Sequence, residues 1–565
     1  MGTCVGTYQC HVHIFLNWAV SWNHVLISVS WPCFGMTCTH VYVRMNYKGV
    51  LDCLVFGLQL RPRMVKIAVQ NPGGDIAYID HPVIRCVELV QELWNGGNVM
   101  FKAAMLGRNT SQDVERCWEN CSDQDWFKRH PHRPEVEHWN STLPVWVHGD
   151  AARAFKCQKI LILSWMCGLM SGCSWNSRLL YSVIPADELS QLTLQSLLAA
   201  FANDINELQR RLKLPWRFLY VASKGDLEWH AMAYRLQRYY RCSLLCFKCF
   251  ASQTEADLLY TNLLDDAGWT YTDVQTSHLL EEFADLIEGA PGLCSIEGWS
   301  AEMMFWDLMH ILFIGLGRLI CGSSMVLLCV TGFYSRSNCT DSHLLGMHGR
   351  FRDWRLRHNV AVYVEKFTHK LIGCPNEIDK CDRYANFPEL DVKAAHVKCI
   401  IMFLADELGK AGLLPNQEVK DAGACLHFLA SFVWTLEHAD LWLTQSEADA
   451  QYSYGMKFLL ILRHLARLGR HHNLSRWNII PKFHYFHHCI RFMWETKMNM
   501  MKATCFLDED FMGKVKKLAS KTHRTTVSLR TLQRYLVLLG LRWKRVRKHR
   551  GLSFENCRRV RARHH

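Results

Sequence analysis

The chain has 565 residues, a formal net charge of +13, 49% hydrophobic residues and 21% charged residues. This composition is typical of a globular protein, and it excludes a disordered chain and a collagen-like polymer. The mean hydropathy of −0.07 argues against a polytopic membrane protein, and an odd count of 25 cysteines argues against a fully disulfide-paired secreted protein.

Residues 1–140 form an N-terminal region in which the sequence predicts no clear order of elements. Cys33, Cys38 and His40 lack the spacing of a zinc finger, so we expect no DNA-reading finger there. The first thirty residues are apolar but lack the basic segment of a signal peptide.

The most ordered part of the sequence follows this region. Leu143–His148, Lys159–Trp165 and Leu179–Ile184 are short apolar runs rich in β-branched and aromatic residues, which predicts three strands. Pro185 and the acids after it predict the start of a helix whose apolar residues recur at helical spacing. Trp216–Ala222 then predicts a fourth strand.

An acidic residue follows the first of these strands, Asp150, and another follows the fourth, Asp226. Three antiparallel strands, a crossover helix and a parallel fourth strand are the opening of an RNase H-like fold, in which the first and fourth strands are neighbours. We therefore expect an α/β protein in which the carboxyl ends of two adjacent strands bring Asp150 and Asp226 together.

From about residue 240 to 480 the pattern becomes helical. The most apolar stretch, Leu319–Tyr334, is shorter than the ~20 residues that a membrane span needs. It continues a segment that carries Asp307, His310 and Arg318, so we expect a buried helix packed against two amphipathic helices, Asp391–Lys410 and Val419–Leu443. The other candidate helices are Ser277–Glu288, Ala301–Ser323, Val360–Leu371 and Ala448–Arg470, and the candidate linkers are Ser335–Asn359 and Gly373–Leu390.

Cysteine and histidine pairs flank this helical region. Cys246 and Cys249 have the Cys-x2-Cys spacing of half a zinc site. His484 and His488 are four residues apart, so a helix would place both on one face, and His487 is the alternative to His488. The alternative interpretation is ordinary packing of buried cysteines and of an aromatic-rich helix.

A third acidic group follows the histidines. Glu509, between Asp508 and Asp510, begins an amphipathic stretch with apolar residues at helical spacing. The alternative for three acids at this place is compensation of the helix macrodipole.

The order of these features resembles a known family. VWVHGDA, GDLEW with the Cys pair after it, PKFHYFHH and CFLDEDF occur in the order found in cut-and-paste DDE transposases with an interrupted RNase H-like core. The chain resembles members of this family such as the CACTA and Plavaka-like group and, more specifically, transposon-derived proteins of protists. Asp307-Leu-Met-His310 also resembles the Asp-x-x-His element in the insertion of that group.

The resemblance implies metal-dependent cleavage of DNA phosphodiester bonds and strand transfer. Asp150, Asp226 and Glu509 would hold two Mg²⁺ or Mn²⁺ ions, whereas the Cys and His pairs would bind a structural zinc ion. The implied division is an RNase H-like core over residues 141–240, a large mostly α-helical insertion over 241–480, completion of the core over 481–541, and a basic tail over 542–565.

The positive charge is concentrated at the end of the chain. Residues 542–565 carry a net charge of +9, which leaves +4 for the rest of the protein. We expect this tail to bind DNA phosphates without reading sequence and to suit a nuclear protein, the alternative being a solvated tail. Gly551 and Glu555 interrupt the run, so one continuous recognition helix is not expected. The candidate DNA-binding residues are Arg545, Arg547, Lys548 and Arg550.

Two other functions remain open from the sequence. One is a non-catalytic, decayed or domesticated transposon-derived DNA-binding protein, and the other is a membrane-associated helical protein built around Leu319–Tyr334. In lipid, Asp307 and His310 would be unpaired and costly, whereas in a soluble core they should have polar partners. The expected partner is therefore DNA rather than a membrane, with a homodimer as one option for the oligomeric state.

Overall fold

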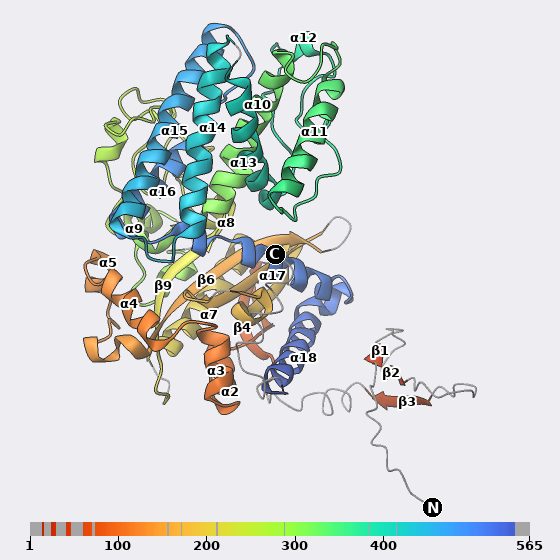
Figure 1. Cartoon of the computed structure of the whole chain (residues 1–565). Coiled ribbons are helices and arrows are strands. Elements are labelled where there is room, and N and C mark those ends of the chain that lie inside the picture. The colour runs from red at the N-terminus through yellow and green to blue at the C-terminus, as the bar shows by residue number, and fades with distance from the viewer. Residues whose placement is uncertain are drawn as a thin grey trace, which may run out of the picture.

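The computed structural model describes residues 60–548, apart from 71–73, 155–157, 171, 211–212, 287–288, 384 and 414, together with three N-terminal strands. The described part is a mixed α/β protein with a central sheet and a large group of helices to one side of it (Figure 1). The N-terminal strands β1 (Ile14–Phe15), β2 (His24–Val29) and β3 (Val41–Asn46) form a separate antiparallel sheet.

The central sheet has five strands in the order β10-β9-β6-β7-β8. β7 pairs antiparallel with both β6 and β8, and β9 pairs parallel with β6 after the crossover helix α7 (Gln191–Arg210). The predicted order of three antiparallel strands, a helix and a parallel fourth strand is thus confirmed. The strands are β6 (Thr142–Arg153), β7 (Lys159–Cys167), β8 (Leu179–Pro185), β9 (Arg217–Gly225) and β10 (Met304–Trp306).

Three details of the predicted sheet were wrong. Asp150 lies within β6 rather than after it, because antiparallel pairing with β7 continues to Arg153. The crossover helix begins at Gln191, after a 3-10 turn, rather than at Pro185. Met304–Trp306, predicted as part of a helix, is the edge strand β10, since parallel pairing with β9 supplies hydrogen bonds that local propensity does not reveal.

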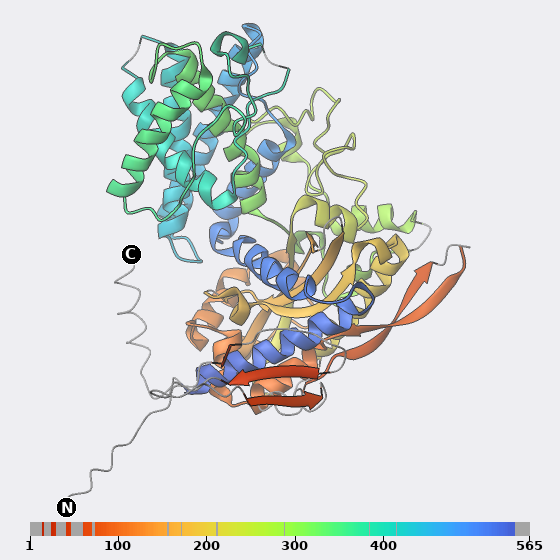
Figure 2. The same ribbon diagram turned by 90° about the vertical axis from the view of Figure 1, so that its right-hand side faces the viewer.

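Helices cover the sheet, and both the inner strand β7 and the edge strand β8 are buried on both faces. Every residue of β8, and all but the first of β7, is buried. The C-terminal helices α17 (Phe506–Ala519) and α18 (Val527–Lys548) contact β6 and β8 and lie across the sheet in Figure 2, where they are blue. Such two-sided burial explains why these strands are almost continuously apolar.

The helical group lies above the sheet in Figure 1. Its helices at 391–410, 419–443 and 448–470 were predicted correctly, with ends shifted by a few residues. The elements are α9 (Thr276–Ala284), the π-helical segment η6 (Met309–Gly317), α10 (Arg318–Val330), α11 (Thr340–Arg357), α12 (Ile378–Cys381), α13 (Ala394–Ala411), α14 (Gln417–His438), α15 (Gln445–His471) and α16 (Pro481–Thr496).

The prediction was wrong for two neighbouring segments, because it assigned a linker where there is a helix and a helix where there is none. The expected linker Ser335–Asn359 contains α11, whereas the expected helix Val360–Leu371 has no regular helix. This segment instead lies along α11, where the carbonyl of Val364 is 2.9 Å from Nε2 of His348. This contact with α11 thus holds the segment in an irregular conformation, and its β-branched residues do not favour a helix.

The apolar helix was predicted to be buried, and it is. η6 and α10 form one continuous helix, Met309–Val330, which is long and apolar enough to cross a membrane by length and composition. However, 89% of its most apolar window is buried inside the protein, and α10 contacts α13 and α14 as expected. This environment is that of a central core helix.

The basic run that begins at residue 542 starts within a helix. α18 continues through this position to Lys548, because Trp543 is buried and holds the helix on the core. Residues 549–565, which include the candidate Arg550, lie outside the described residues, as do the side chains of Arg545, Arg547 and Lys548.

The remaining N-terminal elements are the hairpin β4 (Arg63–Gln70) and β5 (Ile76–Val83), and the helices α2 (Cys86–Asn95), α3 (Asn98–Met105), α4 (Ser111–Cys121) and α5 (Asp125–Arg129).

Candidate functional site

The predicted Cys and His pairs meet in one buried cluster. Sγ of Cys249 lies 3.3 Å from Nε2 of both His484 and His488, and Sγ of Cys246 lies 3.5 Å from Nε2 of His488. All four ligand atoms are within 4.8 Å of one another. A tetrahedral zinc site with metal–ligand distances of about 2.0–2.3 Å separates its ligands by roughly 3.3–3.8 Å. The cluster can therefore hold a metal ion such as zinc.

The chemistry of the cluster also favours a metal. The two Nε2 atoms of His484 and His488 face each other at 3.2 Å, so their lone pairs repel unless a cation or a proton lies between them. The backbone N–H groups of Lys248 and Ala251 donate to the sulfur atoms, which stabilises thiolates. Burial opposes ionisation of Cys246, but a hydrogen bond from Cys249 and the nearby histidines lower its pKa well below the usual value.

The structure decides between the two histidines left open by the sequence. His488 lies in the cluster, whereas His487 is fully buried on another side of α16, where its ring packs 4.9 Å from that of Trp269. Neither ring nitrogen of His487 has a hydrogen-bond partner among the described residues. Trp269 also contacts the ring of His484 at 4.2 Å, so it shields the cluster from solvent.

The three predicted acids come together at one end of the central sheet. Asp150 lies near the end of β6, Asp226 follows β9 as the N-cap of α8 (Leu227–Ala233), and Glu509 lies in the first turn of α17. All three side chains are partly exposed. The negative charges of Glu509 and Asp226 both raise the pKa of Asp150, so the three carboxylates lie close enough to interact electrostatically.

An irregularity in the β6–β9 ladder aligns the two sheet acids. Val145 is opposite Tyr220 but Trp146 is opposite Ala222, so β9 contains one extra residue at this point. The ladder then ends at His148 opposite Lys224, and Asp150 and Asp226 each lie two residues beyond this last pair. Without the bulge, the register would set Asp150 against Gly225, and the two acids would lie at different distances from the last pair.

The acids carry negative charge that nearby groups offset only in part. Burial, together with the charges of Glu509 and Asp226, raises the pKa of Asp150 to about 8. Burial also raises the pKa of Glu509.

The three acids are less compact than the Cys/His cluster, which alone among the described residues places at least three ligand atoms within 4.8 Å of one another. A wider arrangement of carboxylate oxygens suits hard divalent cations rather than zinc.

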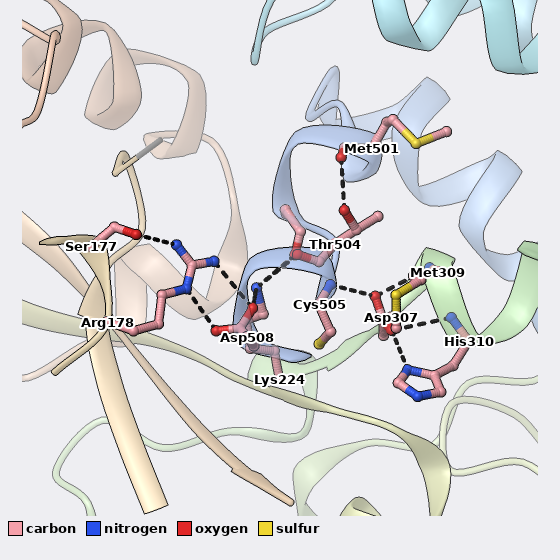
Figure 3. Close-up of polar contacts among 11 residues, drawn as sticks. Ser177, Arg178, Lys224, Asp307, Met309, His310, Met501, Thr504, Cys505 and Asp508 are labelled. Atoms are coloured by element: carbon pink, nitrogen blue, oxygen red, sulfur yellow. Dashed lines mark hydrogen bonds and ion pairs between the residues drawn. The ribbon is translucent and has the colours of Figure 1, made fainter. Parts of the chain in front are cut away.

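Asp307 and His310, noted in the sequence, lie beside these acids and have polar partners (Figure 3). Asp307 is buried and accepts hydrogen bonds from the backbone N–H groups of Met309, His310 and Cys505. It also accepts one from Nδ1 of His310 at 2.5 Å, and Nε2 of His310 lies 3.8 Å from Oε1 of Glu509. Although burial opposes protonation, these carboxylates raise the pKa of His310 to about 9.

The residue before Glu509 has a role that the sequence did not reveal. The sequence analysis gave Asp508 no role of its own, yet it is fully buried and forms ion pairs with Arg178 at 2.8 Å and Lys224 at 2.7 Å (Figure 3). Nζ of Lys224 also donates to the carbonyl of Ala503 at 2.8 Å. These contacts fix the start of α17 on the sheet, and so they position Glu509. The sequence did contain one signal of this role, since Asp508 is a charged residue at an apolar position of an amphipathic helix.

Comparison with known proteins adds no identity to this geometry. No protein-family model matches the chain, and a search of curated proteins found no match. Arguments about function therefore rest on the site itself and on the resemblance of its motifs.

Proposed function

We propose that this protein is a DDE-type polynucleotidyl transferase with an RNase H-like core, which cleaves DNA phosphodiester bonds with divalent metal ions. The observation that carries the proposal is the meeting of Asp150, Asp226 and Glu509 at the carboxyl end of two parallel strands, although they lie far apart in the sequence. The mostly helical residues 241–480 would correspond to the insertion of the family that the motifs resemble.

The chemistry of the donors fits Mg²⁺ or Mn²⁺. Asp150, Asp226 and Glu509 offer carboxylate oxygens on a partly open surface, and the raised pKa of Asp150 reflects a surplus of negative charge there. Bound divalent ions would supply an activated water or 3′-hydroxyl and stabilise the leaving oxygen. The protein's own contribution is to hold the three acids in place through β6, β9 and the fixed start of α17.

The zinc-binding role proposed for the Cys/His cluster is structural. Cys246 and Cys249 follow the core strand β9, whereas His484 and His488 belong to α16 at the end of the helical group. A metal ion at this point would join the two parts of the protein. No position of the cluster is left for a substrate, since all four ligands come from the chain.

One observation favours the non-catalytic alternative. The His310 imidazolium lies 3.8 Å from Glu509 and offsets part of the charge that would attract a divalent ion. A DNA-binding relative that has lost metal binding would retain such a pair. By contrast, the polar partners of Asp307 and His310 and the burial of α10 support a soluble protein over the membrane-associated alternative.

Cleavage of supercoiled plasmid DNA by the full-length protein tests the proposal. We expect nicking with Mg²⁺ or Mn²⁺ and none with EDTA, and we expect Asp150→Asn, Asp226→Asn and Glu509→Gln each to lower the rate at least ~100-fold. Glu228→Gln is the matched control, because Glu228 is an exposed acid two residues after Asp226. Equal activity of the control and the three site variants would contradict the proposed site, and DNA binding without cleavage would favour the non-catalytic alternative.

A further inference from the structure

A glycine precedes each of the two sheet acids, Gly149 before Asp150 and Gly225 before Asp226. Both glycines contact the same side chain, the indole of Trp229. A Cβ atom on Gly149 would lie 2.2 Å from Cη2 of Trp229, and one on Gly225 would lie 2.3 Å from Cδ1 of the same ring. The indole therefore lies across the two strands, with its six-membered ring on β6 and its five-membered ring on β9.

This indole lies where the hydrogen bonds between the two strands end. The β6–β9 ladder stops at the pair His148 and Lys224, whereas β9 continues to pair with β10 at Gly225. Beyond His148, backbone pairing with β9 no longer fixes the position of β6. The carboxylates of Asp150 and Asp226 come immediately after this point, so their separation needs another support.

Trp229 is itself firmly held. It lies on α8, its side chain is 2% exposed, and its backbone N–H donates to Oδ1 of Asp226 at 2.6 Å. Its Nε1 is buried and has no hydrogen-bond partner among the described residues, which is unfavourable for folding. The indole thus occupies this place at some cost, and the same residue fixes both the Asp226 carboxylate and the two backbones.

We infer that Trp229 is a positioning residue, whose indole sets the separation of the Asp150 and Asp226 carboxylates and thereby the affinity of this site for divalent cations. The inference rests on the proposed function, since it concerns the same metal site. Gly149 and Gly225 are required because any side chain there would displace the indole.

Binding of Mn²⁺ to the full-length protein, measured by the electron paramagnetic resonance signal of free Mn²⁺, tests the inference. Loss of a group that orients metal ligands lowers metal affinity by about 10–100-fold, and we expect a loss of this size for Trp229→Leu. Trp229→Phe is a milder second variant whose single ring reaches only one of the two glycines. Circular dichroism and thermal unfolding identify any variant that does not fold.

A double substitution separates positioning from general packing. Gly149→Ala should weaken Mn²⁺ binding by displacing the indole, and adding Trp229→Leu should remove this collision, so the two effects should not add. The matched control is Gly168→Ala, because a Cβ on Gly168 would lie 2.2 Å from Nε1 of Trp146 in the same sheet. It should lower the melting temperature but leave Mn²⁺ affinity unchanged.

The possible outcomes distinguish the inference from the proposed function. If Asp150→Asn abolishes Mn²⁺ binding while both Trp229 variants retain wild-type affinity, the inference is wrong and the metal site stands. If the wild-type protein binds no Mn²⁺, or if Asp150→Asn binds it as tightly as wild type, both proposals are wrong. If the Gly168→Ala control weakens binding as much as Gly149→Ala, the effect is general packing and the inference is wrong.

Discussion

The protein contains two clusters of side chains of types that can ligate metal ions, and the two differ in almost every physical respect. The Cys/His cluster is compact and mostly buried, and its ligands are soft. The acid cluster of Asp150, Asp226 and Glu509 is wider and partly exposed, and its ligands are hard oxygen atoms. A chain that closes all coordination positions builds a structural site, whereas one that leaves like charges near an open surface builds a site for exchangeable cations.

The comparison predicts that removal of a ligand changes the stability of the protein in opposite directions in the two clusters. In the Cys/His cluster, loss of a ligand should destabilise the protein, since a structural metal ion that binds only the folded chain stabilises the fold. In the acid cluster, loss of a carboxylate should stabilise the metal-free protein, since it relieves repulsion. Four variants test this contrast: two remove ligands of the clusters, and two remove charged residues next to the acid cluster.

The largest effect is expected for Cys246→Ser/Cys249→Ser. Structural zinc contributes about 10–16 kcal/mol in small zinc-binding peptides, so the double variant should lose its zinc and most of its stability. Elemental analysis of the purified protein and thermal unfolding measure the two losses. Cys321→Ser/Cys425→Ser is the matched control, because both residues are fully buried cysteines outside the cluster. Equal zinc content in the two double variants would contradict the assignment.

A smaller loss of stability is expected for Asp508→Asn. The variant leaves Arg178 and Lys224 buried without a counter-charge, which typically costs about 3–5 kcal/mol in the free energy of unfolding. Urea denaturation at pH 7 measures the loss. The control Asp510→Asn removes an exposed ion pair with Lys514 and should cost about 0–1 kcal/mol.

The pH dependence of this contribution follows from the pKa of Asp508. Burial opposes ionisation, but Lys224 and Arg178 lower this pKa far below its usual value. A lowered pKa stabilises the fold above the unfolded-state value of about 3.9 and loses that effect as the pH falls below it. The difference between wild type and Asp508→Asn should therefore shrink on acidification below this value, and a constant difference down to pH 2 would contradict the ion pairs.

Asp150→Asn should act in the opposite direction in the metal-free protein. Because the folded-state pKa of Asp150 is raised from 3.8 to about 8, its penalty appears above pH 3.8 and is complete above pH 8. In EDTA at pH 8 the variant should be more stable than wild type by about 1–3 kcal/mol, with little difference at pH 4. Mn²⁺ should stabilise wild type but not the variant, and loss of stability at pH 8 in EDTA would refute the like-charge argument.

An effect of similar size is expected for His310→Gln, which removes the cation next to the acids. A raised pKa of about 9 stabilises the fold fully below the unfolded-state value of 6.5, and this contribution is lost as the pH rises through 9. We expect His310→Gln to cost about 1.5–3 kcal/mol at pH 6 and much less at pH 9.5 in EDTA. His358→Gln, at an exposed position, is the control and should show no such dependence.

Much of the candidate site could be predicted because its signals are local. Asp150 and Asp226 stand where two apolar runs end, and the spacing within the Cys and His pairs already carries ligand geometry. Hydrophobic periodicity likewise predicted α7, α13, α14 and α15, since it reports the buried face of each helix.

The errors have a common physical origin in contacts between distant segments. β10 is a strand because β9 offers it a pairing partner, and residues 360–371 form no helix because they contact α11 instead. Asp508 could not be distinguished from its neighbours in sequence, because its buried partners come from β9 and from the residue before β8.

The sequence by itself determined the strand order, the apolar core helix, the ligand types and the spacing within each pair, because these depend on side-chain chemistry and on the periods of helices and strands. Only the tertiary structure decided whether these groups meet. The one-residue bulge in the β6–β9 ladder brings Asp150 level with Asp226, and the indole of Trp229 packs on the glycine before each. Register and close packing are properties of paired segments, so no single stretch of sequence contains them.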